Sequence, residues 1–200
     1  MCSEHVLPCL PARKGGDMMK RIHLPASRQE LRELRAGEEV LLSGTIYTAR
    51  DAAHKRLKEL IEKGEPLPFD LQDAVIYYVG PTPARPGQVI GSAGPTTSSR
   101  MDPYVPLLCE HGMAGMIGKG RRSEEVRQAV MKHGAVYFVT VGGAGALLSK
   151  AITAAEPVAF EDLLSEAVVR LTVKDFPCFV GMDTEGNDIY DLADQCVSDR

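Results

Sequence analysis

The sequence predicts an α/β domain in which helices flank a mixed β-sheet. Short apolar runs of strand length, such as 38–49 and 135–141, alternate along the chain with segments of helical periodicity. From residue 158 onward, strand-like runs follow one another without a helix between them, which favours strands of both directions in one sheet. The chain has 200 residues, of which 44% are hydrophobic, so it can enclose a core. We expect a loose leader at residues 1–20 and a single domain at 21–195.

The first helix and the strand after it carry clear local signals. Ser27, with Glu30 three residues later, has the spacing of a capping box and predicts a helix that ends near Gly37. The run 38–49 is rich in β-branched residues, which predicts a strand with a bulge at Gly44.

The following elements are predicted by cap residues and apolar runs. Asp51 is expected to cap a helix that ends at Gly64, and the continuous apolar run 74–80 predicts a buried strand. Asp102 and Pro103 have the order of an N-cap and a first-turn proline, so a third helix is expected to begin there.

The second half of the chain is expected to end in strands. Helices are predicted after Ser123 and, behind a glycine turn, within 142–152. A turn at 185–187 is expected to close a hairpin. The expected strands are 113–118, 135–141, 158–163, 168–173 and 176–183.

The composition excludes several classes of partner. Lys and Arg total 23 against 27 Asp and Glu, which gives a formal net charge of −4 and a pI near 5.8. Such a chain has no overall positive field to hold nucleic acid or an anionic membrane. No apolar run reaches about 18 residues, so no transmembrane helix is expected.

The cysteines indicate a reducing compartment, here taken to be the cytoplasm. Their number is odd, their positions are scattered, and no CxxC pair occurs, which argues against a disulfide framework. The histidines show no ligand spacing either, so no complete metal or cluster site is expected in this chain. The five cysteines are Cys2, Cys9, Cys109, Cys178 and Cys196.

Residues 91–102, GSAGPTTSSRMD, are the first candidate for chemistry. Glycines there allow the backbone to approach a ligand closely, and Thr96 and Thr97 begin a row of four hydroxyl side chains. Arg100 adds a planar guanidinium that suits a carboxylate. One interpretation is a pocket for a small carboxylate or phosphate. The other is a capping turn whose hydroxyls satisfy the backbone.

Two further segments carry cations next to expected strand ends. Lys119 lies between glycines in GMIGKGRRS, either as a ligand-binding cation or in a solvated basic turn, and the Walker A order is absent. Arg50 falls where a strand passes into a helix, a place where ligands often bind. His54 is expected to be a helix-surface or packing residue rather than a base. The glycines of 142–148 match half of a dinucleotide fingerprint, and tight packing explains them equally well.

Six segments, taken in order, carry a resemblance to a known family: SGTIYTARDAAHKRL, IYYVGP, GSAGPTTSSRMDPY, MIGKG, AVYFVTVGGAGALL and VKDFPCFVGMDTEGNDIYD. The chain resembles the β subunit, equivalent to the C-terminal domain, of iron–sulfur class I fumarate hydratases and L-tartrate dehydratases. The resemblance covers about residues 22–192. It implies a swivelling β/β/α-type domain. It also implies an α subunit that holds a [4Fe–4S] cluster through three cysteines, so that this chain itself binds no cofactor.

The resemblance also implies roles for five residues by position. Arg50 and Arg100 would hold the carboxylates of a small dicarboxylate substrate, and Lys119 would add positive charge on the same anion. Thr96 would be the proton-transfer residue. Thr97 would bind substrate through its hydroxyl or amide.

These roles imply reversible hydration of fumarate to malate by an enzyme that is active only with its α subunit. L-Tartrate and the methylated fumarate mesaconate are the alternative substrates. From the residues alone, a non-catalytic module that binds an anion or nucleotide and a purely structural subunit remain alternatives. A homodimer of this chain or an α2β2 assembly is expected.

Overall fold

A run of parallel strands with their carboxyl ends at one edge forms the centre of the structure. The computed structural model describes residues 19–140 and 143–198. Within these ranges, seven strands form one sheet in the order β1-β2-β3-β4-β5-β7-β6. The strands are β1 (Lys20–Leu24), β2 (Glu39–Thr48), β3 (Val75–Tyr77), β4 (Gly115–Gly118), β5 (Val136–Val139), β6 (Ile152–Ala159) and β7 (Val168–Met182).

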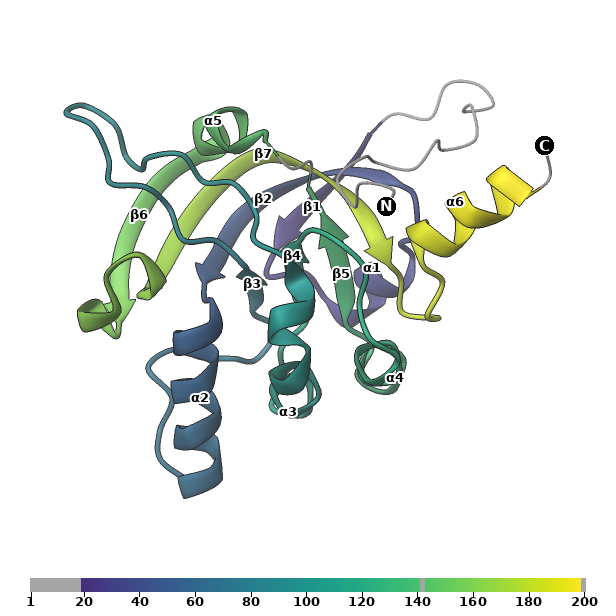
Figure 1. Cartoon of the computed structure of the whole chain (residues 1–200), viewed down its shortest axis with the longest axis horizontal. Coiled ribbons are helices and arrows are strands. Elements are labelled where there is room, and N and C mark those ends of the chain that lie inside the picture. The colour runs from purple at the N-terminus through teal and green to yellow at the C-terminus, as the bar shows by residue number, and fades with distance from the viewer. Residues whose placement is uncertain (1–18, 141–142, 199–200) are drawn as a thin grey trace.

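The sheet is mixed and closes on itself. Strands β1 to β5 pair in parallel with their neighbours, whereas β7 runs antiparallel to β5 and β6. The long β7 also pairs with β2 along the edge that β3 leaves free, from Glu39↔Phe179 to Tyr47↔Arg170. This second pairing joins β2 to the strand that also pairs with β5, so the predicted mixed sheet with flanking helices is confirmed in a barrel-like form (Figure 1).

Helices cover the outside of the curved sheet. Figure 1 shows α2, α3 and α4 together on one side and α5 on the opposite side. The helices are α1 (Arg28–Arg32), α2 (Asp51–Lys63), α3 (Val105–Glu110), α4 (Glu124–His133), α5 (Gly145–Leu148) and α6 (Ile189–Ser198), with 3-10 turns η1 (Ser98–Tyr104), η2 (Ser149–Ala151) and η3 (Glu161–Glu166).

The side chains of β5 show how the sheet separates two cores. Val136 and Phe138 belong to the core inside the curved sheet, whereas Tyr137 and Val139 belong to the core beneath α2, α3 and α4. Because both faces are covered, every residue of β5 is buried. This explains why the strand is continuously apolar in the sequence and does not alternate.

Several local predictions are confirmed. Ser27 Oγ accepts the Glu30 N–H at 3.2 Å, and the Glu30 carboxylate accepts the Ser27 N–H at 3.0 Å, which completes the capping box. Ser123 caps α4, and Gly64 ends α2 in the left-handed conformation. The pairing of β2 with β7 shifts register between Leu42 and Gly44, as the predicted bulge requires.

The predicted caps at Asp51 and Asp102 are wrong. Arg50 occupies the N-cap position of α2, and Asp51 is the first helical residue. Asp102 and Pro103 lie inside η1, and α3 begins at Val105. Each carboxylate instead serves an arginine; the guanidinium of Arg122, whose side chain is fully buried, donates to Asp102 at 2.8 Å. A buried charge needs a partner more than a helix end needs a cap.

The prediction for the C-terminal third is also wrong in its segmentation. Residues 168–182 form one strand instead of two, and β6 covers residues 152–159, of which only 158 and 159 were expected to lie in a strand. The segment after the turn at 185–187 is helix α6 and not the second arm of a hairpin. These elements depend on pairing between β7 and three other strands, which leaves no local signal.

The expected leader falls almost wholly in residues 1–18, outside the described residues. Within the described ranges, we find no helix with the length and apolar character that crossing a bilayer requires.

The bulge at Gly44 generates a stability prediction. Gly44 has φ +117°, and an added Cβ would overlap the backbone of Leu24 on β1. Gly64 also has positive φ, but a Cβ there meets nothing within 4 Å. We expect Gly64→Ala to cost about 1–2 kcal/mol of unfolding free energy and Gly44→Ala to cost clearly more, measured by urea denaturation. Equal losses would contradict the close approach of β1 to the bulge.

Candidate active site

The carboxyl ends of the parallel strands bring the predicted residues to one edge of the sheet. Arg50 follows β2, Gly80 follows β3, and Lys119 comes directly after β4. In α/β sheets, ligands bind outside such strand ends, where the following loops converge.

The segment that holds the two threonines returns to this edge between β3 and β4. The Thr96 N–H donates to the carbonyl of Tyr78 at 2.8 Å. Thr97 forms a parallel bridge with Lys119. Thr96 is half-buried and Thr97 is exposed. The structure therefore places Thr96, Thr97 and Lys119 beside one another.

Ser98 fixes this junction. Its N–H donates to the Lys119 carbonyl at 2.9 Å, and its buried Oγ accepts the Lys119 N–H at 3.0 Å. The same Oγ shares a hydrogen bond of 2.9 Å with the Tyr137 hydroxyl. A Cβ at Gly118 would overlap this oxygen, so glycine is required there. Sequence reasoning treated Ser98 only as one hydroxyl in a row and missed its positioning role.

The two predicted arginines meet at one carboxylate. Arg100 Nε lies 2.9 Å from Asp51 Oδ1, and Arg50 Nε lies 3.9 Å from Asp51 Oδ2. The Arg50 side chain is 21% exposed and that of Arg100 is 50% exposed, so both can reach a ligand from solvent. The buried Nε of Arg50 has no hydrogen-bond partner in the described structure.

Gly80 joins the two groups of residues. A Cβ at Gly80 would lie 2.6 Å from Arg50 Nη1, and Gly80 comes two residues after Tyr78, which binds the Thr96 backbone. The five predicted residues thus line one edge of the sheet, with Arg50 and Arg100 on one side and the threonines with Lys119 on the other.

Two arginines follow Lys119 closely in the sequence, and both form ion pairs with carboxylates. Arg121 is half-exposed and pairs with Asp191 at 3.2 Å. Arg122 is buried, pairs with Asp102, and lies over the rings of Tyr78 and Tyr137. Within the described part of the chain, no ion pair is formed by Lys119. Its charge is therefore available to an anion at the strand ends.

His54 packs in the core, as expected. Its side chain is fully buried between the rings of Tyr78 and Tyr104, and its Nδ1 lies 2.8 Å from the Arg50 carbonyl. Burial lowers the pKa of this imidazole to about 4, so it is neutral at physiological pH. Its contact with Arg50 is through the backbone, which supports the start of α2.

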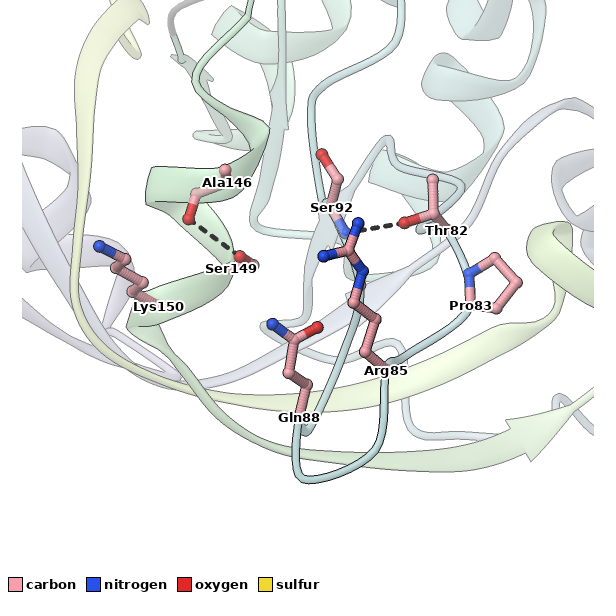
Figure 2. Close-up of a pocket in the computed structure, with 9 residues that line it drawn as sticks. Thr82, Pro83, Arg85, Gln88, Ser92, Ala146, Ser149 and Lys150 are labelled. Atoms are coloured by element: carbon pink, nitrogen blue, oxygen red, sulfur yellow. Dashed lines mark hydrogen bonds between the residues drawn. The ribbon is translucent and has the colours of Figure 1, made fainter.

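The 82–92 loop lines a separate cleft of about 350 Å³ (Figure 2). The cleft separates this loop from α5 and η2, and the loop is closed at its base by hydrogen bonds between Thr82 and Ser92. In Figure 2 the Arg85 side chain points toward Ser92, whereas Lys150 extends away from the loop. None of the five predicted site residues lines this cleft.

Packing explains one glycine of the 142–148 segment, Gly145 at the start of α5. A Cβ at Gly145 would lie 2.5 Å from Ser92 Oγ and 2.8 Å from the Gly94 nitrogen. The Ala93 N–H donates to the Gly145 carbonyl at 3.2 Å. Close approach of α5 to the 92–94 segment therefore accounts for Gly145 without a nucleotide. Gly142 lies outside the described residues.

Two of the described cysteines, Cys109 and Cys178, do not fit an iron–sulfur cluster. Cys109 and Cys178 are buried, and burial raises the pKa of both thiols, to about 12 for Cys109. A cluster needs thiolates at a shared opening. Across residues 19–140 and 143–198, we find no group of three His, Cys, Asp or Glu side chains able to hold a metal ion.

Comparison with known protein families identifies the family of this chain. The family model described as the fumarase C-terminus matches residues 3–193. The chain belongs to the fumarase C-terminus family. Among its relatives is fumarate hydratase 2 of Leishmania major, which is 44% identical over 165 residues. The anaerobic class I fumarate hydratase of Escherichia coli K12 is 46% identical over 151 residues.

Members of the fumarase C-terminus family differ in length relative to this chain. The matches cover 82% and 74% of this chain but only 29% and 28% of those two fumarate hydratases. A putative L(+)-tartrate dehydratase subunit β of Methanocaldococcus jannaschii is 36% identical over 180 residues, which covers 87% of this chain and 92% of the relative. The chain thus spans under a third of the two hydratases and nearly all of the β subunit.

Burial of His54 generates a pH prediction. In the unfolded chain His54 has a pKa near 6.5, whereas in the folded chain it stays neutral down to about pH 4. The unfolded state therefore binds the extra proton, and folding stability falls as pH drops from about 6.5 to 4, by up to about 3 kcal/mol. We expect His54→Gln to remove this part of the slope in urea denaturation series. Parallel stability curves for the two proteins would contradict it.

Proposed function

We propose that this chain is the β-type subunit of a hydro-lyase that interconverts fumarate and malate. One observation carries the proposal: Arg50 and Arg100 meet at Asp51 on the strand edge that also holds Thr96, Thr97 and Lys119. The membership of the chain in the fumarase C-terminus family and the names of its relatives support the choice of reaction.

The proposed substrate fits the charge of the edge. Arg50, Arg100 and Lys119 provide three positive charges against the carboxylates of Asp51 and Glu166, so a dianion has a net attraction. Guanidinium groups bind carboxylates through two parallel N–H donors, and the Arg50 and Arg100 side chains are 21% and 50% exposed at this edge. We assign substrate carboxylates to the two arginines and supporting charge to Lys119.

Thr96 is the proposed proton-transfer residue. In the direction from malate to fumarate, a C–H proton next to a carboxylate moves to the deprotonated Thr96 oxygen, and the C–H electron pair delocalises into that carboxylate. The pair then forms the C=C bond as the hydroxyl group on the adjacent carbon departs as hydroxide, a departure that a cluster on the partner would assist as a Lewis acid. A neutral hydroxyl is a weak base, but nearby cations favour its deprotonated form. The same cations stabilise the doubly negative carboxylate more in the transition state than in the ground state. Thr97 binds substrate through its hydroxyl or amide.

The proposal requires an α-type partner. We place the [4Fe–4S] cluster on that partner, because the buried Cys109 and Cys178 of this chain do not fit one. The relative named as a β subunit has nearly the same length as this chain, which supports a divided enzyme. We further propose a homodimer or an α2β2 assembly in the cytoplasm, and the free thiols support a reducing compartment.

L-Tartrate is the second candidate substrate, because the relative that this chain spans almost completely is named as a tartrate dehydratase subunit. Mesaconate is a third, since one added methyl group leaves both carboxylates in place. Assays of the assembled enzyme with fumarate, L-tartrate and mesaconate separate the three. A preference for fumarate supports the proposal, and turnover of L-tartrate or mesaconate alone replaces its substrate.

Removal of the Thr96 hydroxyl tests its proposed role. Thr96→Val keeps the backbone N–H that donates to Tyr78. We expect kcat for fumarate hydration by the assembled enzyme to fall by about 10²–10⁴, because general acid–base catalysis contributes about that much. Ser99→Ala, which removes an exposed hydroxyl three residues later, is the control and should leave kcat unchanged. A Thr96→Val enzyme that retains wild-type kcat would rule this residue out.

Removal of the Arg100 guanidinium tests carboxylate binding. Arg100→Ala should lower kcat/KM by about 10²–10³, because a charged partner of the transition state is worth about 2–4 kcal/mol. Arg85→Ala removes an equal charge from the separate cleft and is expected to have little effect. If both variants lose activity equally, Arg100 acts only through long-range electrostatic attraction and does not contact the substrate.

A further inference from the structure

The connection between β6 and β7 lies against the start of α2, next to the candidate active site. The Arg56 guanidinium on α2 donates to Asp162 of η3 at 2.7 Å and lies over the Phe160 ring at 5.3 Å. Figure 1 shows this connection where β6 ends and β7 begins, and η3 contacts α2. A segment more than a hundred residues away in the sequence is therefore held beside Arg50.

Glu166, the last residue of η3, is the charged residue of this connection that contacts Arg50. One carboxylate oxygen accepts the Ala52 N–H in the first turn of α2 at 2.9 Å. The other lies 3.6 Å from Arg50 Nη2. The Glu166 side chain is 24% exposed and that of Arg50 is 21% exposed, so solvent screens the pair only in part. One carboxylate thus ties the helix start and the guanidinium together.

Arg50 is held by charge and packing more than by hydrogen bonds. Its distances to Glu166 and Asp51, 3.6 and 3.9 Å, both exceed hydrogen-bond length. A Cβ at Gly80 would lie 3.1 Å from the Ser165 carbonyl and 2.6 Å from Arg50 Nη1, so the guanidinium fills a narrow space. Its Nε has no hydrogen-bond partner in the described structure. The guanidinium is therefore oriented by its surroundings, and the 21% of the side chain that is exposed remains accessible to a ligand.

We propose that Glu166 is a positioning residue, which holds the Arg50 guanidinium in the orientation that binds a substrate carboxylate. This inference rests on the proposed function. Its cost is a negative charge close to a dianionic substrate, which by itself weakens binding. Positioning outweighs that repulsion, because a flexible arginine must otherwise be ordered when substrate binds. The two effects have opposite signs, so one substitution distinguishes them.

Glu166→Gln in the assembled enzyme separates positioning from repulsion. The amide oxygen still accepts the Ala52 N–H, but the charge that holds Arg50 is gone. We expect KM for fumarate to rise about tenfold with a smaller change in kcat, and Glu166→Asp to recover part of the loss. Glu161→Gln removes the same charge from the first turn of η3 and should leave both constants unchanged. A KM that is unchanged or lower in Glu166→Gln would overturn the proposal.

A second measurement on the full chain alone keeps this inference separate from the proposed function. In ¹⁵N-labelled protein, the Arg50 Nε–H signal, assigned with Arg50→Lys, should be sharp in the wild type and in Glu161→Gln. It should broaden or disappear in Glu166→Gln. Persistence of the signal in Glu166→Gln overturns the positioning role. If the wild-type assembly lacks hydratase activity, the proposed function fails, while this signal still decides whether Glu166 orders Arg50.

Discussion

The site depends on the parallel pairing of β2, β3, β4 and β5. Parallel strands place all their carboxyl ends at the same edge, so the loops after them must meet there. Arg50, Gly80 and Lys119 come from three of these loops, and β7 closes the sheet so that the edge keeps its shape. An antiparallel arrangement would have sent alternate loops to opposite ends and separated the cations.

The cations of this acidic chain differ in how closely carboxylates pair with them. The buried Arg122 has a full partner in Asp102 and supports the core, whereas Lys119 forms no ion pair within the described residues. Arg100 pairs with Asp51 at 2.9 Å, and Arg50 lies between the carboxylates of Asp51 and Glu166. The cations that face the strand ends are thus oriented but incompletely satisfied, which is the condition for binding an external anion.

Elements with local signals were predictable from sequence, whereas elements formed by distant pairing were not. The capping box at Ser27 and the left-handed glycine at Gly64 follow from the identity of a few neighbouring residues. The single long β7 follows from its pairing with β2, β5 and β6, which no short window contains. The parallel order likewise explains why five residues chosen by motif lie at one edge. Glu166 had no such signal, because its proposed role depends only on where η3 packs.

The most direct test is a crystal structure of this chain assembled with the proposed α-type partner and a bound dicarboxylate. We expect one carboxylate of the ligand to lie within hydrogen-bond distance of the Arg50 and Arg100 guanidinium groups. We also expect Thr96 Oγ1 to lie next to the carbon that bears the transferred proton, with Lys119 beside the same anion. A dicarboxylate bound away from the carboxyl ends of β2, β3 and β4 would contradict the proposed site.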